Sequence, residues 1–138
     1  MRMLLTTPPP FVFAEAERTV LAAEEILRGA LAGEGADPLF AVFRGAALTA
    51  LRLQVARLTA RGVRIEERDL TRRLVHFDPT RAEAVLAVAA EHRLATRDAG
   101  NQAWAATERQ WWTRLAFADG TWWITEQRIL PPDQWLPT

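Results

Sequence analysis

The sequence predicts an α+β fold, in which N-terminal helices pack in the concave face of a curved, four-stranded antiparallel meander. Three features predict it. Apolar residues recur at helical spacing through residues 11–60, and the period changes to that of strands from Val63 onward. Near the C-terminus, Asp119-Gly120 separates two strand-like runs that each carry a Trp pair, the commonest signal of a two-residue hairpin. Helices followed by strands with short turns place the helices on one face of the sheet.

Two helices are expected before the sheet. The first spans residues 11–31 and ends at Gly33-Glu34-Gly35, with its charged side chains, Glu24 among them, mostly off the apolar stripe. The second spans residues 38–60, with Asp37 as its N-cap and Gly62 closing it. Its inward stripe is expected to contain Leu39, Phe43, Ala47, Leu51, Val55 and Leu58.

Four strands are expected to follow. The first spans residues 63–77, and a change of phase at Arg68-Asp69 indicates a bulge or a bend. The second spans residues 84–96, and a turn at 98–102 leads to the third, which starts at Trp104. Consecutive prolines after Leu130 stop the fourth strand, and Trp135 is expected to fold back as a lid on the core. Residues 11–138 therefore form one domain, preceded by a flexible arm, residues 1–10.

The composition excludes several chemistries. The chain of 138 residues contains no Cys and no Tyr, and the printed sequence has no Ser and no Lys. Thiolate metal sites, serine triads, lysine Schiff bases and phosphate-binding loops with a Gly-Lys-Ser/Thr motif are therefore absent. No cofactor is expected, and chemistry is left to the two His, the carboxylates, Arg, Thr or Trp.

The charge pattern does not favour nucleic acid as a partner. The net charge is zero, and arginines alternate with acidic residues instead of gathering in one block. The longest apolar runs are far too short to span a bilayer, and the start, MRMLL, is too short for the apolar part of a signal peptide. The expected compartment is the cytoplasm, without membrane insertion.

The two-residue loop also fixes which hairpin residues share a face. Counting outward from Asp119-Gly120 places Leu115 opposite Ile124 and Phe117 opposite Trp122, on the face expected to build the core. The same count adds Trp111, Thr113, Glu126 and Arg128 to that face. The opposite face receives Trp112, Arg114, Ala116, Trp123, Thr125 and Gln127.

These motifs resemble the nuclear-transport-factor-2-like superfamily. The pattern L-x-x-x-G stands at Leu58 to Gly62, and W-x-x-R-L-x-x-x-x-G-x-W-x-I-x-E stands at Trp111 to Glu126. Within the superfamily the chain looks most like the intermembrane-space domain of chloroplast-division proteins and their bacterial relatives. The resemblance covers residues 11–132 and implies a curved sheet wrapped around helices as a cone, in a non-catalytic interaction module. Enzymes of the superfamily use tyrosine, aspartate or histidine in the cone, and the isomerase's tyrosine has no counterpart here.

Histidine is the candidate acid or base. His92 lies in the middle of an otherwise apolar strand face, where a general base of a cone-shaped pocket would lie, or where a hydrogen-bonded structural histidine would. His76 and Asp78 share a strand face before a turn, so Asp78 either orients His76 or only forms the turn. Two histidines are too few for a metal site, and none is expected.

The hairpin supplies the other candidates. On its inner face, Glu126 and Arg128 are expected at the mouth of the cone, where they either hold a polar ligand or pair with each other. The candidate ligand-binding residues are Trp111, Thr113, Glu126, Arg128 and Arg109. On its outer face, Trp112, Arg114 and Trp123 either form a dimer or partner interface or are covered by the C-terminal tail.

Two functions are compatible with the sequence. The leading hypothesis is a non-catalytic protein- or ligand-binding module that pairs through its outer sheet face, as a homodimer or with another protein. The alternative is a small enzyme of the isomerase, cyclase or dehydratase type, with a small molecule in the cone and a His or Asp as acid and base. A hollow cone with a histidine at its wall favours the second kind of site, and a filled cone excludes it.

Overall fold

The computed structural model describes residues 9–137, so the predicted arm, residues 1–10, lies mostly outside the described residues. Two long helices, α1 (Phe13–Gly29) and α2 (Gly45–Ala60), are connected by a π-helical turn, Ala30–Glu34, and a 3-10 turn, Asp37–Ala41. The strands and a last 3-10 turn follow in the order β1 (Val63–Asp78), β2 (Glu83–Thr96), β3 (Gly100–Asn101), β4 (Ala105–Ala118), β5 (Thr121–Ile129) and Pro132–Gln134. Within residues 9–137, no helix is long and apolar enough to cross a bilayer.

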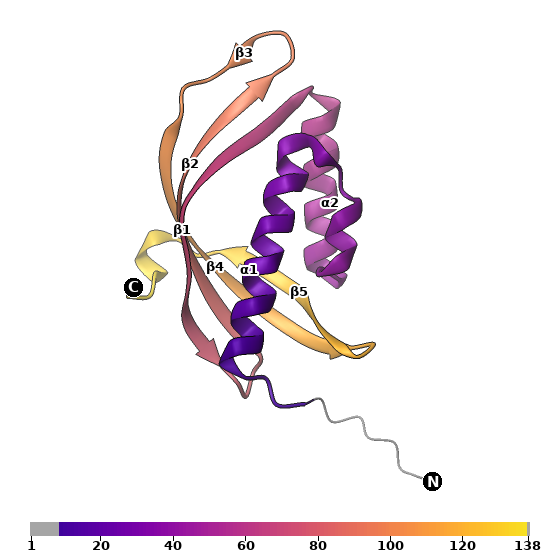
Figure 1. The fold of residues 1–138 in the computed structure, drawn as a ribbon, viewed down its shortest axis with the longest axis vertical. Coiled ribbons are helices and arrows are strands. Elements are labelled where there is room, and N and C mark those ends of the chain that lie inside the picture. Colours follow the sequence, from indigo (N-terminus) through magenta and orange to yellow (C-terminus); the bar gives the residue numbers. More distant parts are fainter. Residues whose placement is uncertain (1–8, 138) are drawn as a thin grey trace.

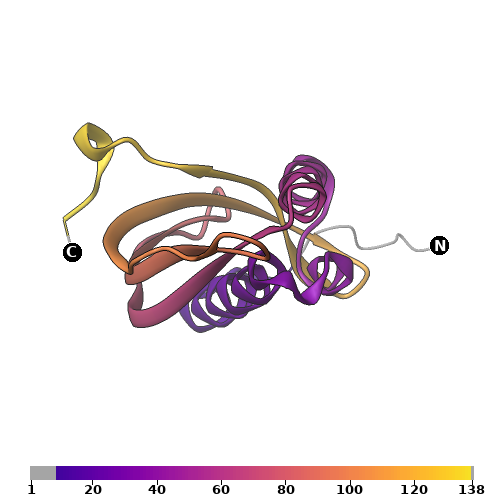
Figure 2. The same cartoon turned by 90° about the horizontal axis from the view of Figure 1, so that it is seen from above.

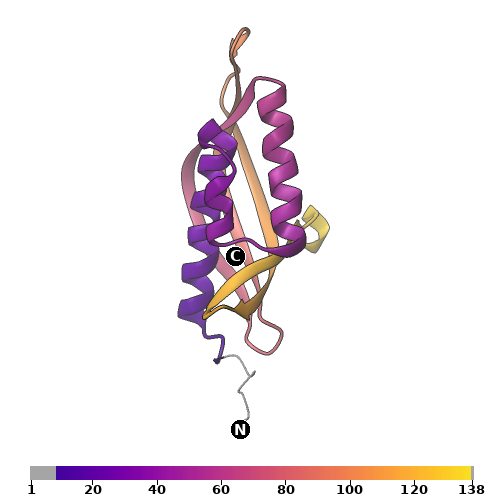
Figure 3. The same cartoon turned by 90° about the vertical axis from the view of Figure 1, so that its right-hand side faces the viewer.

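The strands form one antiparallel sheet in the order β1-β2-β4-β5, with the short β3 paired to β2. Figure 1 shows this sheet curving around α1 and α2, and Figures 2 and 3 show both helices on its concave side. The predicted α+β fold is confirmed. The sheet has five strands instead of the four expected, because two residues of the 98–102 turn pair with Ala95 and Thr96.

The second predicted helix is interrupted, which corrects the expected span of 38–60. At residues 42–44 the chain leaves the helix and runs along the free edge of β5, where Phe43 forms a parallel bridge with Ile124. Arg44 N–H donates to the Ile124 carbonyl and Ile124 N–H donates to the Val42 carbonyl, both at 2.9 Å. The strand edge thus satisfies backbone groups that a continuous helix would have paired internally. The expected stripe is nevertheless buried at Leu39, Phe43, Ala47, Leu51 and Val55.

The long first strand bends, as its sequence predicts. Its register with β2 shifts between Asp69 and Thr71 and again between Leu74 and His76. Such bulges increase the local twist and let a strand curve. This bend lets β1 curve around α1, which lies against the concave face of the sheet (Figure 1).

The hairpin follows the expected register only near its turn. Asp119 and Gly120 both have positive φ, 52° and 81°, which is the backbone that a two-residue I′ turn requires. The pairs from Ala118–Thr121 out to Leu115–Ile124 are those predicted. Beyond them the prediction is wrong, because Thr125 is an extra residue: Arg114 pairs with Glu126, and every pair farther out is shifted by one.

We expect Gly120→Ala to destabilise the fold by about 1 kcal/mol, since a side chain is strained at positive φ. Urea unfolding followed by tryptophan fluorescence measures the change. The matched control is Asp119→Asn, which keeps a residue that tolerates positive φ and removes only an exposed ion pair with Arg44. The control should lose at most about 0.5 kcal/mol. Equal stability of Gly120→Ala and the wild type would contradict the turn geometry.

Candidate functional site

A cavity of about 430 Å³ lies between the two helices and the inner face of the sheet. Its walls are mainly apolar and come from every layer of the cone: Leu27, Leu31, Ile65, Leu94, Trp111 and Ile129. His92, Arg93 and Arg109 also line it, together with Gln54 and Gln102. Apolar walls with a few convergent polar groups are typical of small-molecule sites, and the volume lies within their usual range.

A buried polar network forms the floor of this cavity. Arg109 of β4 places Nη2 3.0 Å from Glu24 Oε1 of α1 and 3.0 Å from Glu67 Oε2 of β1. Arg72, also on β1, places Nη2 2.5 Å from Glu67 Oε1. His92 Nε2 of β2 lies 2.6 Å from Glu67 Oε2. The network therefore ties helix α1 to three strands.

The two carboxylates of the network differ in their affinity for protons. Glu24 is 3% exposed, and this burial raises its pKa to about 7, although Arg109 acts in the opposite direction. Burial also acts to raise the pKa of Glu67, but hydrogen bonds from Arg109 and His92 outweigh it and hold that pKa below its ordinary value. Glu67 is thus the ionised centre of the network, and Glu24 exchanges its proton near neutrality.

His92 lies inside the cone, on the face that the sequence assigns to it, but it is fully engaged. Its Nδ1 lies 2.5 Å from Thr107 Oγ1, and its Nε2 lies 2.6 Å from Glu67. A general base needs a nitrogen that can reach the substrate. Because both ring nitrogens of His92 have protein partners, the hydrogen-bonded structural role fits it better than catalysis.

His76 and Asp78 lie outside the cone. His76 pairs with Val85 and is exposed, so its side chain lies on the opposite face of the sheet from His92. Asp78 Oδ1 accepts hydrogen bonds from the backbone N–H groups of Thr80 and Arg81, at 2.9 and 3.1 Å, which is the turn-forming role. Of the two roles that the sequence left open for Asp78, the structure shows the turn-forming one, and it places His76 and Asp78 away from the cone, where they were considered as an acid and base. Within residues 9–137, no three His, Asp or Glu side chains are grouped as metal ligands would be.

Because Thr125 is an extra residue in β5, the candidate ligand-binding residues lie on two different faces of the sheet. Trp111 and Arg109 line the cavity, and Thr113 is buried beside them on the inner face. Glu126 and Arg128 lie on the outer face instead of at the mouth of the cone, which corrects the expectation from the regular register. There, Arg114 Nη1 lies 3.2 Å from Glu126, and the Arg128 guanidinium lies 4.9 Å from the Trp112 ring centre.

The predicted interface residues lie on the outer face, but side chains of the same chain cover them in part. The Arg114 guanidinium lies 5.1 Å from the ring centre of Trp112, which Arg128 also approaches. Arg44 lies 3.6 Å from the ring centre of Trp123, whose indole N–H donates to the Ala118 carbonyl at 2.7 Å. Both tryptophans are half-buried. They form cation–π pairs instead of a bare apolar patch.

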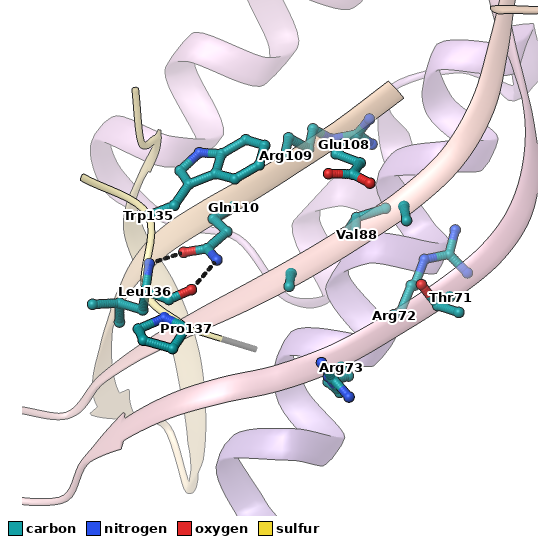
Figure 4. Close-up of a pocket in the computed structure, with 12 residues that line it drawn as sticks. Thr71, Arg72, Arg73, Val88, Glu108, Arg109, Gln110, Trp135, Leu136 and Pro137 are labelled. Carbon is teal, nitrogen blue, oxygen red and sulfur yellow. Dashed lines mark hydrogen bonds between the residues drawn. The ribbon is translucent and has the colours of Figure 1, made fainter. Parts of the chain in front are cut away.

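The C-terminal tail also lies on the outer face, on the side of the sheet away from the helices (Figure 1). Trp135, Leu136 and Pro137 border a hollow of about 660 Å³ there (Figure 4). The buried Gln110 side chain donates to the Leu136 carbonyl at 2.7 Å and accepts from the Leu136 N–H at 2.8 Å (Figure 4). The indole N–H of Trp135 also donates to the Leu130 carbonyl. Trp135 is therefore not a lid on the core, because this bond and the bonds of Gln110 hold the tail on the outer face.

Sequence reasoning missed four residues of the network. Glu24 lies four residues after Val20 and three before Leu27, so it falls on the apolar stripe of α1, and this position was a readable signal of a buried charge. Glu67 and Arg72 flank the bend of β1, where the side-chain alternation changes, so the sequence does not show which face they occupy. Nothing in the sequence marks Thr107, whose hydroxyl belongs to the network because it lies 2.5 Å from His92 Nδ1.

No family model matches the chain, and no curated protein matches it. Among solved structures, the intermembrane space region of the chloroplast protein ARC6 matches with a TM-score of 0.76. It shares 17% sequence identity, and the match covers 88% of this chain and 98% of that one.

Two further structures match over most of their length. Aln2 from a Streptomyces species has a TM-score of 0.54 at 13% identity, with 91% of this chain and 94% of that chain covered. CagV, a VirB8 homolog of T4SS from Helicobacter pylori, has a TM-score of 0.53 at 13% identity, with 82% and 97% covered. At such identities the likeness shows the fold alone. The chain has the nuclear-transport-factor-2-like, cystatin-like cone fold.

Proposed function

We propose that the chain is a non-catalytic binding module whose ligand site is the cavity of the cone. The observation that carries the proposal is the hollow of about 430 Å³, with apolar walls and basic groups at its floor. The fold alone does not choose between binding and catalysis, because the same fold can host unrelated functions. The choice rests on the side chains that reach the cavity.

The cone is hollow and His92 lines it, as the enzyme hypothesis requires, but the groups that an isomerase, cyclase or dehydratase would need do not face the cavity in a reactive form. His92 has a partner on each ring nitrogen, and His76 and Asp78 lie on the other face of the sheet. Glu24 titrates near neutrality, but it is not among the residues that line the cavity and borders an adjoining void of about 10 Å³. A ligand in the cavity therefore meets surfaces that bind and orient it, without an acid or base positioned for proton transfer.

The second candidate is assembly through the outer sheet face, as a homodimer or with a protein partner. Its support is the outer hollow of about 660 Å³, which forms a trough over Ala87 and Ala89 of β2. Exposed Arg73 borders this trough on one side, and exposed Glu108 borders it on the other. Within residues 9–137 neither side chain forms an ion pair. A two-fold axis would bring Arg73 of each copy to Glu108 of the other, which is the self-complementary arrangement of an isologous dimer.

The cavity should bind the neutral apolar dye N-phenyl-1-naphthylamine, and the variant Ala105→Trp should block it. Ala105 lines the cavity, so an indole there fills part of the volume. Fluorescence titration should show one dye site in the wild type and at least about tenfold weaker binding in the variant. Ala106→Trp is the matched control, because Ala106 is the next residue of β4 and points to the outer face. Equal binding by both variants would count against the cavity as the site.

Stability should fall as the pH rises through neutrality, because of Glu24. Its pKa rises from 4.5 to about 7 on folding, so the stabilisation from its proton is complete below about pH 4.5 and lost above about pH 7. Urea unfolding of the wild type should lose up to about 3 kcal/mol between pH 5 and pH 8. The lowered pKa of Glu67 acts in the opposite sense and only at lower pH.

Glu24→Gln should remove most of this dependence, since the amide carries no titrating proton. Glu25→Gln, at an exposed position next along α1, should keep the wild-type slope. An unchanged slope in Glu24→Gln would show that Glu24 is not the group responsible.

If two copies pair through the trough, Glu108→Arg should dissociate the dimer, and the double variant Glu108→Arg with Arg73→Glu should restore it. Both residues are exposed, so neither change should disturb the fold. Multi-angle light scattering after size exclusion measures the mass directly. A wild-type protein that stays monomeric at all accessible concentrations would eliminate this candidate and leave the cavity proposal unaffected.

A further inference from the structure

Within residues 9–137, no carboxylate is among the residues that line the cavity. His92 and Arg109 line it from the inner face, whereas the Arg93 guanidinium pairs with Glu66 at 2.6 Å; the other polar lining residues, Gln54 and Gln102, are neutral. Glu24 and Glu67 are not among these lining residues: both border an adjoining void of about 10 Å³, and Glu67 also borders a separate hollow beside Glu66 and Trp104. An occupant therefore meets aliphatic walls, one indole ring and, at the floor, the Arg109 guanidinium. Such a surface favours a ligand with an apolar body and one anionic group.

Arg109 is the part of this floor with hydrogen-bonding capacity left over. Glu24 and Glu67 share its Nη2, while Nη1 lies 3.1 Å from the His92 ring. Its buried Nε–H has no partner within residues 9–137, and neither has Glu24 Oε2. A guanidinium offers a planar fork that a carboxylate can occupy with two parallel hydrogen bonds. Glu24 accepts a hydrogen bond from Arg109 through Oε1 only, so it does not form the two parallel hydrogen bonds that the guanidinium offers.

We propose that the cone binds an apolar small molecule that ends in a carboxylate, and that this carboxylate replaces Glu24 on Arg109. The inference rests on the proposed binding function and names the class of its ligand. The aliphatic part lies against Leu27, Leu31 and Ile65, and the carboxylate lies against Arg109, which lines the same cavity. Glu67 stays in place, because Arg72 and His92 also hold it.

Replacement of Glu24 on Arg109 couples ligand binding to proton uptake. The charged groups around Glu24 are Glu25 and Arg28 on α1, Glu67, Asp69 and Arg72 on β1, His92 on β2 and Arg109 on β4. Burial already raises the pKa of Glu24 to about 7, and the contact with Arg109 is the main influence that lowers it. Loss of that contact, beside the anionic Glu67, favours the protonated form. Glu24 then takes one proton as one anion enters, and the net charge of the floor is unchanged.

Three probes of equal chain length test the ligand class: octanoate, 1-octanol and octylamine, each competing with N-phenyl-1-naphthylamine. At pH 7, octanoate should bind at least about tenfold more tightly than 1-octanol, because only the carboxylate makes charge-assisted hydrogen bonds to Arg109. Octylamine should bind more weakly than 1-octanol. The comparison uses the wild-type protein, so no variant has to fold for it to be decisive.

The coupling is tested by pH. The affinity for octanoate should fall by up to about tenfold between pH 7 and pH 8 if one proton is taken up. The affinity for 1-octanol should stay constant. In Glu24→Gln the octanoate affinity should be independent of pH and should match the wild-type value at low pH, while Glu25→Gln behaves as the wild type. Calorimetry in phosphate and Tris buffers counts the protons directly.

The outcomes separate the two levels of the proposal. If the dye binds and Ala105→Trp blocks it, but octanoate and 1-octanol bind equally, the carboxylate inference is overturned and the binding function stands. If octanoate is preferred but takes up no proton, its carboxylate does not replace Glu24, and this part of the inference fails. If neither the dye nor any of the three probes binds, the proposed function fails, and the ligand class fails with it.

Discussion

The ion pairs of Arg109 are the interaction on which the cone depends. One guanidinium of β4 contacts Glu24 of α1 and, across β2, Glu67 of the edge strand β1, so it joins the helix to the sheet. Buried charges are costly to desolvate, and removing one partner leaves another unpaired. A rotation of α1 that took Glu24 off this contact would therefore be strongly disfavoured. The pairs fix which face of α1 meets the sheet, while apolar burial supplies most of the attraction.

The same network explains why the cone is not packed solid. Leu86, Val88, Phe43 and Ile124 fill the part of the interior beyond the charges, and all four are fully buried. At the floor, charged side chains with fixed hydrogen bonds take the positions that apolar residues would otherwise fill. Apolar walls cannot close onto these groups without removing the hydration of the exposed part of Arg109. The cavity next to Arg109 and His92 is therefore a consequence of the charged network at its floor.

The sequence predicted the elements of the fold better than the site. Helical spacing, the Asp119-Gly120 turn and the phase change at Arg68-Asp69 are local signals, and each corresponds to the feature it predicted. The side of the sheet taken by Glu126 and Arg128 depends on one extra residue, Thr125, and nothing in the residue types of β5 marks it. The polar network joins residues as far apart as Glu24 and Arg109, which no local pattern connects. His92 was located correctly, but its partners lie on other strands, and they decide what it can do.

All Lys and Arg positions of the chain are Arg, and this affects how much apolar surface the outer face exposes. Each of the three tryptophans Trp104, Trp112 and Trp123 has at least one guanidinium within 5.1 Å of its ring centre. A flat, weakly hydrated guanidinium covers an aromatic face and still pairs with a carboxylate at its edge, as Arg114 does with Glu83. The tryptophans thus have less apolar surface to offer a partner than their number suggests. The alanine trough of β2 is the part of the outer face that we propose for contacts between copies, and the cavity of the cone is the site that we propose for a ligand.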